Sequence, residues 1–408
     1  NQASAIWARP KSEVDEAAHK EFYHHVSHAM DDPWLTLHFR AEGVIEYTGL
    51  LYIPTSRPFD LFHPERKCSV KLYVKRVFIT QDCEHLLPSW LRFARGVIDS
   101  EDLPLNVSRE LLQNSPVLAR IRAGVTSRIL NALSEKAEKE PDSYNGFWDA
   151  FGPVLKEGLY EDFEHRDKLT KLVRFRSTAS DDLVSLEEYV GRMKEGQEAI
   201  YYIAGDDLEP IQRSPQLEGF RAKGIEVLLM TDPIDEFWVP TVGVFETKPF
   251  KSVTRGSADL DKIAADDDAG KDKTEEKPAE GMDALIAAIK LELGDAVQDV
   301  RSSSRLTDSA VCLVAGEDDL DMNLQRLLKQ QGQLSAITPR VLELNPKHAL
   351  IAGLAAKAQK SATDEALTPA AHLLLDQARI IEGEPLPDPV AYAKRMSEIM
   401  SNAFAAKG

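Results

Sequence analysis

The sequence predicts an α/β region in two parts, followed by a small α+β domain that ends in a helical bundle. Strand-like and helix-like segments alternate over residues 1–256, and a strand, a helix and a second strand follow one another at residues 199–230. That order implies a right-handed parallel crossover. Two apolar helical segments close the chain, whose 408 residues exceed one ordinary core and predict two or three domains.

The first α/β part, residues 1 to about 140, is predicted to begin with strands. Residues 50–54 are an apolar run that ends at a turn, and residues 69–79 alternate like a half-buried strand. With a phase shift inside that strand, the residues expected to face a core are Val70, Leu72, Val74, Val77 and Ile79.

Helices are expected to follow these strands. Apolar residues recur with helical spacing from Ser108 to about Glu138. A second helix is predicted over residues 145–159, ended or bent at Gly158, within a helical connector from about 141 to 180.

The second α/β part, about 181–256, opens with a helix signal. Ser185 and Glu188 have the spacing of a capping box, in which each side chain bonds the backbone beside the other. Residues 199–203 and 225–230 are buried strand candidates. The following segment, 257–281, holds nine acidic and four basic residues and no aromatic residue, so we expect a flexible acidic linker or loop.

The last domain, 282–408, is predicted to be α+β. A helix is expected at 284–293, and short strands at 311–314 and 340–344. Between these strands, four leucines share one helix face: Leu320, Leu324, Leu327 and Leu328. The stripe is ordinary core if it is covered, and a ledge for non-native chains if it is open.

Two helices finish the chain. Thr368-Pro369 and Asp388-Pro389 each supply an N-cap followed by proline, and Gly383 separates the helices. Their apolar stripes suggest a homodimer through a four-helix bundle, and the alternative is that both helices fold back on their own domain. The residues that we assign to the dimer interface are Leu374, Ala378, Ile381, Met396, Ile399 and Met400.

Composition excludes several functions. The net charge of −18 argues against binding to nucleic acid or to an anionic membrane, and no apolar run has the length of a membrane span. Three cysteines without CxxC spacing fit a reducing compartment, the cytoplasm. No phosphate-binding glycine loop, kinase signature or nucleophile elbow is present, and a chain that opens on Asn1 without a signal peptide is expected to be a fragment.

Arg109 is the first candidate site residue. Ser108 reads as a helix cap, so Arg109 lies at a helix N-terminus, where a cation opposes the macrodipole. An anion that comes and goes, such as a nucleotide phosphate, would explain it, and a surface ion pair with Glu101 or Asp102 is the simpler alternative.

Two further constellations are ambiguous. His24 and His28 have helical spacing but lack a third ligand, so we expect solvated histidines and no metal. Glu236, Phe237 and Trp238 follow a strand and a proline turn, and they form either a structural anchor or a sticky surface for another polypeptide.

Taken together, the chain resembles the ninety-kilodalton heat-shock protein family, and most closely its bacterial form. The resemblance covers nearly the whole chain and is weakest in the acidic segment and at residues 352–368. It is carried by residues 6–9, 50–54, 71–79, 96–113, 185–189, 192–197, 200–203, 226–229, 232–236 and 342–348.

The resemblance implies the middle domain (1–256) and C-terminal dimerisation domain (282–408) of an ATP-driven clamp chaperone. It implies that Arg109 reaches the γ-phosphate of ATP, with Gln113 supporting the same loop, while ATP and Mg²⁺ bind mainly to an N-terminal domain outside this chain. It places client binding at Glu236, Phe237 and Trp238 and on the 320–328 helix. Homodimers, non-native clients and other chaperones of the folding network are the implied partners, in the cytoplasm.

Overall fold

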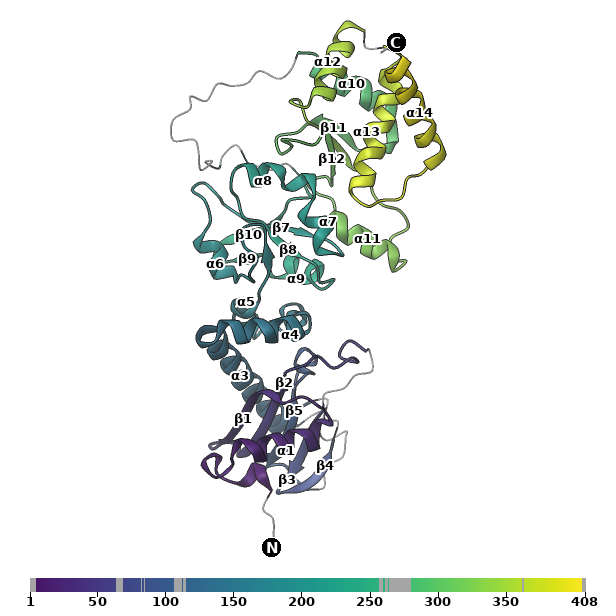
Figure 1. Ribbon diagram of the computed structural model, residues 1–408. Helices are drawn as coiled ribbons and strands as arrows, with labels where there is room; N and C mark the ends of the chain where they lie inside the picture. The colour runs from purple at the N-terminus through teal and green to yellow at the C-terminus, as the bar shows by residue number, and fades with distance from the viewer. Residues whose placement is uncertain are drawn as a thin grey trace. The chain divides into compact units, whose positions relative to one another are not determined.

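The computed structural model describes residues 5–63, 69–81, 83, 85–105, 112, 115–256, 260, 263, 280–361 and 363–405. It divides into two compact units, Asn1–Arg174 and Phe175–Gly408 (Figure 1). Mixed sheets with helices fill both units, which confirms the predicted α/β and α+β fold class. Of the helices in the described part of the chain, none combines the length and the apolar character that a membrane crossing would need.

The first unit is built on a five-stranded sheet with the order β1-β2-β5-β3-β4. The sheet is antiparallel except for the parallel pair β3 and β5, and β5 lies at its centre. Its strands are β1 (Pro33–Ala41), β2 (Tyr47–Pro54), β3 (Ser69–Val74), β4 (Val77–Thr80) and β5 (Arg95–Ser100).

The predicted single strand over residues 69–79 is wrong, because this segment is a hairpin. Lys75 and Arg76 both have positive φ, at 49° and 66°, as a two-residue turn between twisted strands requires. Val70, Leu72 and Val74 are buried as expected, whereas Val77 is exposed and Ile79 is only half-buried. The reversal of the chain produces the change in apolar phase.

One face of this sheet is covered by the start of the chain. The 3-10 turns η1 (Ile6–Ala8) and η2 (Lys11–Glu13) lead into α1 (Glu16–Ser27), which is capped by the Asp15 side chain. Trp7 and Tyr23 pack with Leu50, Tyr52 and Val97 of the two central strands. A third 3-10 turn, η3 (Ser89–Leu91), precedes β5.

Three helices complete this unit: α3 (Pro116–Lys139), α4 (Pro141–Glu161) and α5 (Arg166–Leu172). Ser115 caps α3 by accepting the Leu118 N–H, and the predicted start at Ser108 lies outside the described residues. Gly158 does not end the helix, since α4 continues to Glu161. A Cβ at Gly158 would lie 2.8 Å from both Trp90 and Leu169, so glycine is needed there for close packing.

The second unit contains a five-stranded sheet with the order β6-β8-β7-β10-β9. The predicted parallel pairing of the two buried strands, β7 and β8, is confirmed, and so is the capping box at Ser185 and Glu188, with both reciprocal bonds. The strands are β6 (Arg176–Ser177), β7 (Ile200–Ala204), β8 (Leu228–Met230), β9 (Val244–Phe245) and β10 (Lys248–Ser252). The helices are α6 (Leu186–Gly191), α7 (Leu208–Gln212), η4 (Pro215–Leu217), α8 (Glu218–Ala222) and α9 (Asp235–Val242).

Most of the acidic segment, 257–281, lies outside the described residues. Two apolar residues of this segment are described, and their burial contradicts the prediction of a flexible linker at these two positions. Leu260 and Ile263 are buried against the core around β7 and β8, and their carbonyl groups accept hydrogen bonds from Lys223 Nζ. Leu260 and Ile263 therefore belong to the core of the second sheet.

The last part of the second unit surrounds a three-stranded sheet with the order β11-β13-β12. Apolar faces of three helices and this sheet form one core. The elements are α10 (Met282–Leu293), η6 (Gly294–Ala296), β11 (Asp299–Ser302), β12 (Val311–Val314), α11 (Met322–Gln330), β13 (Val341–Leu344) and α12 (Ala349–Lys360).

The two terminal helices are α13 (Leu367–Ile381) and α14 (Pro389–Ala405). Asp388 caps α14 as predicted, by accepting the Ala391 N–H at 2.9 Å. Thr368 does not cap α13, which begins one residue earlier, and its hydroxyl donates to Glu292 instead. Gly383, with φ at 71°, follows the end of α13.

Candidate functional site

The strand that precedes Arg109 is firmly held in the first unit. Asp99, near the end of β5, is buried and accepts hydrogen bonds from Trp7 Nε1 at 2.9 Å and from the Arg76 N–H at 3.1 Å. Leu103 and Leu112 are also buried. Arg109 and Gln113 lie outside the described residues, so their predicted contact with nucleotide stays a prediction.

Trp238 lies inside the second unit and not on its surface. Its side chain has an exposed fraction of 0% and lies near the rings of Phe175 and Phe250, with centroid distances of 6.0 and 5.5 Å. Its indole N–H donates to Asp235 Oδ1 at 2.6 Å. The predicted client contact at Trp238 is therefore corrected to a structural anchor, while Phe237 is half-buried.

Glu236 is buried as well, beside α11. Its Oε1 accepts a hydrogen bond from Asn323 Nδ2 at 2.8 Å. Asp321, which caps α11, accepts hydrogen bonds from Ser252 and Thr254 of the second sheet. These contacts attach α11 to the second α/β part. Burial, and next the negative charge of Asp321, raise the pKa of Glu236 from 4.5 to about 8.

The raised pKa of Glu236 predicts a pH-dependent stability. Between about pH 4.5 and 8 the folded chain holds a proton that the unfolded chain releases, so the free energy of unfolding falls as pH rises through this window. We expect Glu236→Gln to flatten this dependence, by up to about 1.4 kcal/mol per pH unit. Urea unfolding at a series of pH values measures it.

The matched control for this prediction is Glu209→Gln. Glu209 is an exposed carboxylate that pairs only with Arg213 in the described structure. An unchanged slope in Glu236→Gln, or an equal change in Glu209→Gln, would contradict a buried, protonated Glu236.

Helix α11 is anchored by polar side chains and turns its leucines outward. Asn323 and Gln325 are buried, and Gln325 donates to the Leu320 carbonyl at 2.8 Å and accepts the Thr338 N–H at 3.1 Å. Leu324, Leu327 and Leu328 are only half-buried, and Leu320, just before the helix, is 46% exposed. The predicted leucine stripe is therefore neither fully buried core nor a fully open ledge, and its role in client binding stays a prediction.

The predicted dimer residues fall into two groups. Leu374 and Ala378 are buried in the core of their own domain. This part of α13 therefore folds back on its own domain, which was the alternative to dimerisation. Exposed fractions of 37–52% characterise the remaining four: Ile381, Met396, Ile399 and Met400. Those four stay a prediction for the contact with a second copy.

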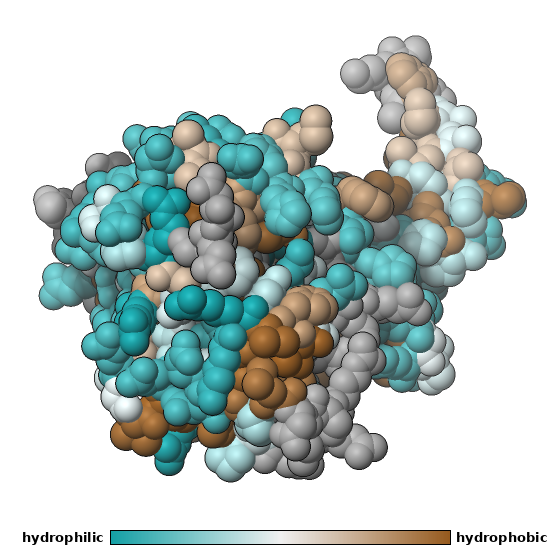
Figure 2. All heavy atoms as spheres, turned by 90° about the horizontal axis from the view of Figure 1, so that it is seen from below, coloured by the Kyte–Doolittle hydropathy of each residue, from teal (hydrophilic) through white to brown (hydrophobic). Residues whose placement is uncertain are grey.

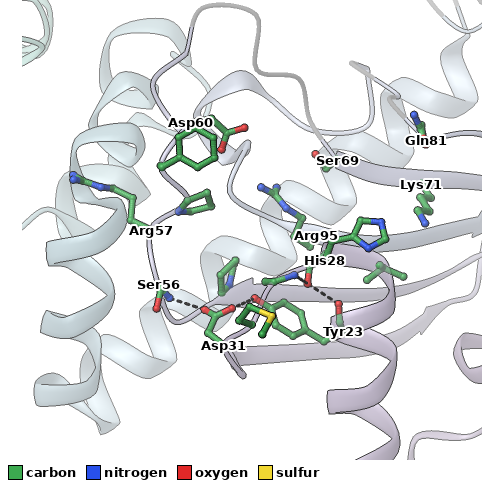
Figure 3. Close-up of a pocket in the computed structure, with 17 residues that line it drawn as sticks. Tyr23, His28, Asp31, Ser56, Arg57, Asp60, Ser69, Lys71, Gln81 and Arg95 are labelled. Atoms are coloured by element: carbon green, nitrogen blue, oxygen red, sulfur yellow. Dashed lines mark hydrogen bonds between the residues drawn. The ribbon is translucent and has the colours of Figure 1, made fainter.

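A cavity of about 820 Å³ in the first unit was not predicted (Figure 3). Figure 3 shows Asp31 bonded to Tyr23 and Ser56 at its edge, with distances of 2.8 Å to both. Buried Arg95 lines it, and its Nη1 donates to the carbonyl groups of Arg92 and Ala94. Of the candidate site residues named from the sequence, only His28 lines this cavity. The sequence contains no motif that would have indicated it.

His24, within α1, and His28, which directly follows that helix, have different surroundings. His24 Nδ1 lies 2.9 Å from the Ala29 carbonyl oxygen, and its Nε2 lies 3.4 Å from Asp32 Oδ1. His28 ends the helix with a positive φ of 55°. Within the described ranges, no three His, Cys, Asp or Glu side chains are grouped as metal ligands.

Apolar side chains also reach the surface of the first unit. Figure 2 looks at this unit from below and shows hydrophobic groups among the hydrophilic ones. The exposed apolar residues of this unit include Met30, Phe59, Val77 and Phe78. Single exposed apolar residues of this kind are normal on folded proteins and by themselves mark no binding surface.

Comparison with known proteins gives a consistent result. The family model described as "Hsp90 protein" matches residues 1–407. The chain is similar to "Chaperone protein HtpG" of Paramagnetospirillum magneticum, with 59% identity over 99% of this chain and 65% of that protein. It is 56% identical to the proteins of the same name from Roseobacter denitrificans and Rhodospirillum rubrum, with the same coverage. The chain thus spans about 65% of the length of these relatives.

Proposed function

Because the chain belongs to the Hsp90 family, we propose that it is the middle and C-terminal part of an ATP-dependent, dimeric chaperone of the cytoplasm. ATP and Mg²⁺ would be held mainly by a further domain of the full-length protein, which supplies the phosphate chemistry. In this proposal Arg109 stabilises charge on the γ-phosphate, Gln113 supports its loop, and the 408-residue chain by itself does not hydrolyse ATP.

The partly exposed leucine face of α11 is the observation that best supports client binding. A half-exposed apolar stripe, held in place by polar contacts on its buried side, offers a surface to non-native chains without being needed for the core. Phe237, half-buried in the neighbouring α9, extends this surface in the proposal, and Glu236 orients α11 from beneath.

Homodimerisation is proposed for the terminal helices. Residues Ile381, Met396, Ile399 and Met400 expose apolar surface that a second copy would cover in a four-helix bundle. Other chaperones of the folding network are further proposed partners. The charge of −18 gives no basis for binding nucleic acid or an anionic membrane.

Polar substitution on α11 tests the client-binding proposal. In the full-length protein, Leu324→Ser with Leu327→Ser should reduce the suppression of client aggregation several-fold, because apolar contact area is lost. The melting temperature should change little, because these leucines lie outside the buried core. Light scattering of a heat-denatured client measures the effect.

The control is Leu350→Ser, which alters a leucine on α12 that is 47% exposed and thus more exposed than Leu324 and Leu327. We expect it to leave aggregation suppression unchanged. Full suppression by the α11 variant would remove α11 from the client surface, and an equal loss in Leu350→Ser would show that any exposed leucine suffices.

A further inference from the structure

The second sheet has a topological switch point. Strand β7 is central, and both of its neighbours, β8 and β10, run parallel to it. The chain moves from β7 to β8 on one side and later returns to β10 on the other. In such sheets a crevice forms outside the carboxyl ends of the strands where the order reverses, and ligands bind there.

A cavity of about 240 Å³ lies at this point. It is lined by the end of β7 at Ile203–Gly205, by Thr254 just after β10, and by Met322 of α11. Ile211 and Ile381 add apolar walls, and buried Gln216 adds an amide. The cavity is therefore enclosed by the second sheet and by the last domain within the same unit.

The charges around this cavity are mainly negative. Asp206 and Asp207 line it, are exposed, and have no hydrogen-bond or ion-pair partner in the described part of the chain. Glu382 lines it too, and its Oε1 accepts a hydrogen bond from Gln216 Nε2 at 2.9 Å. The one basic lining residue, Arg326, donates to the Glu382 carbonyl group at 2.9 Å.

These carboxylates suit an extended organic cation better than a metal ion. Among the described residues, no three acidic, His or Cys side chains are grouped closely enough to hold a metal. Apolar side chains of Ile203, Ile211, Met322 and Ile381 also line the cavity, and they favour contact with methylene groups over water. Removal of Glu382 from water raises its pKa to about 7, and a neighbouring ammonium group would favour its charged form.

We propose that this cavity binds a small aliphatic diamine or polyamine. An ammonium group would bind at Asp206 and Asp207 at the opening, the methylene chain would pack against Ile203, Ile211 and Met322, and a second ammonium group would approach Glu382. A ligand seated there would contact both the second sheet and α11.

Calorimetric titration of putrescine into the 408-residue chain tests the proposal. At about 0.15 M salt, where diffuse attraction to an acidic protein is screened, we expect saturable binding at one site per chain. Replacing both carboxylates, as Asp206→Asn with Asp207→Asn, should weaken the affinity about tenfold. Since both side chains are exposed and unpartnered within the described structure, the melting temperature of this variant should be unchanged.

Matched probes separate this site from general attraction of cations. Glu209→Gln removes a nearby exposed carboxylate that does not line the cavity, and it should leave putrescine affinity unchanged. Neither 1,4-butanediol, which lacks the charges, nor Mg²⁺ at equal ionic strength should compete. Absence of saturable binding, an equal loss in Glu209→Gln, or competition by Mg²⁺ would overturn the proposal.

Discussion

Replacing Arg109 by alanine in the full-length protein is expected to lower kcat for ATP hydrolysis about 10²- to 10³-fold. The guanidinium group would act on charge that develops as the γ-phosphate is transferred, so its loss should appear in kcat. The affinity for ATP should stay the same, because nucleotide binds mainly to another domain in our proposal. Steady-state hydrolysis and equilibrium nucleotide binding measure the two quantities.

Arg120→Ala is the matched control for this prediction. Arg120 is an exposed arginine in the first turn of α3, a short distance further along the chain. Its replacement should leave hydrolysis within about twofold of the unaltered protein, since it is exposed and outside the proposed site. Hydrolysis that survives Arg109→Ala, or that falls equally in Arg120→Ala, would remove the catalytic role of Arg109.

Replacing Trp238 by alanine is expected to lower the free energy of unfolding of the second unit by about 3–5 kcal/mol. The indole is fully buried near Phe175 and Phe250, so truncation leaves a large cavity in the second α/β part. Urea unfolding followed by circular dichroism measures the loss. A change below about 1 kcal/mol would contradict the anchoring role.

Trp238→Phe separates packing from hydrogen bonding. Phenylalanine retains an aromatic ring beside Phe175 but lacks the N–H that donates to Asp235. We expect a loss of about 1.5–3 kcal/mol, the range for one hydrogen bond to a charged group. Aggregation suppression should persist in this variant, because the side chain presents no surface to a client.

Sequence patterns that are compatible with only one local structure were interpreted correctly. The capping box at Ser185 and Glu188 forms both of its bonds, and the strand–helix–strand order yields the parallel β7–β8 pair. Each rests on a chemical pairing or a chain direction that few alternatives satisfy.

Sequence patterns that are compatible with two different structures could not be assigned from the sequence alone. A change of apolar phase near Lys75 fits either an irregular strand or a hairpin, and only the positive φ values reveal the turn. A glycine within a helical pattern marks an end or a close contact, and Gly158 proved to be the contact. For Gly158 a deciding neighbour, Trp90, is distant in the sequence, whereas the hairpin is decided by the local backbone at Lys75 and Arg76.

The candidate site shows the same limit. A pattern of apolar residues cannot distinguish a buried tryptophan from an exposed one, and Trp238 belongs to the core. On α11 the usual expectation is reversed, because Asn323 and Gln325 are inside and the leucines lie toward the surface. The hydrogen-bond partners that permit this, Glu236 and Thr338, come from other segments.

The polar anchoring of α11 separates two demands on its sequence. Asn323 and Gln325 are needed for the fold, because the hydrogen bonds of their amide groups hold the helix in place. The leucines Leu324, Leu327 and Leu328 of the same helix are not part of the buried core, so their substitution should change the apolar surface of the helix with little change in stability. If α11 binds clients as proposed, changing side chains on one side of this single helix would alter the range of clients at little cost in stability.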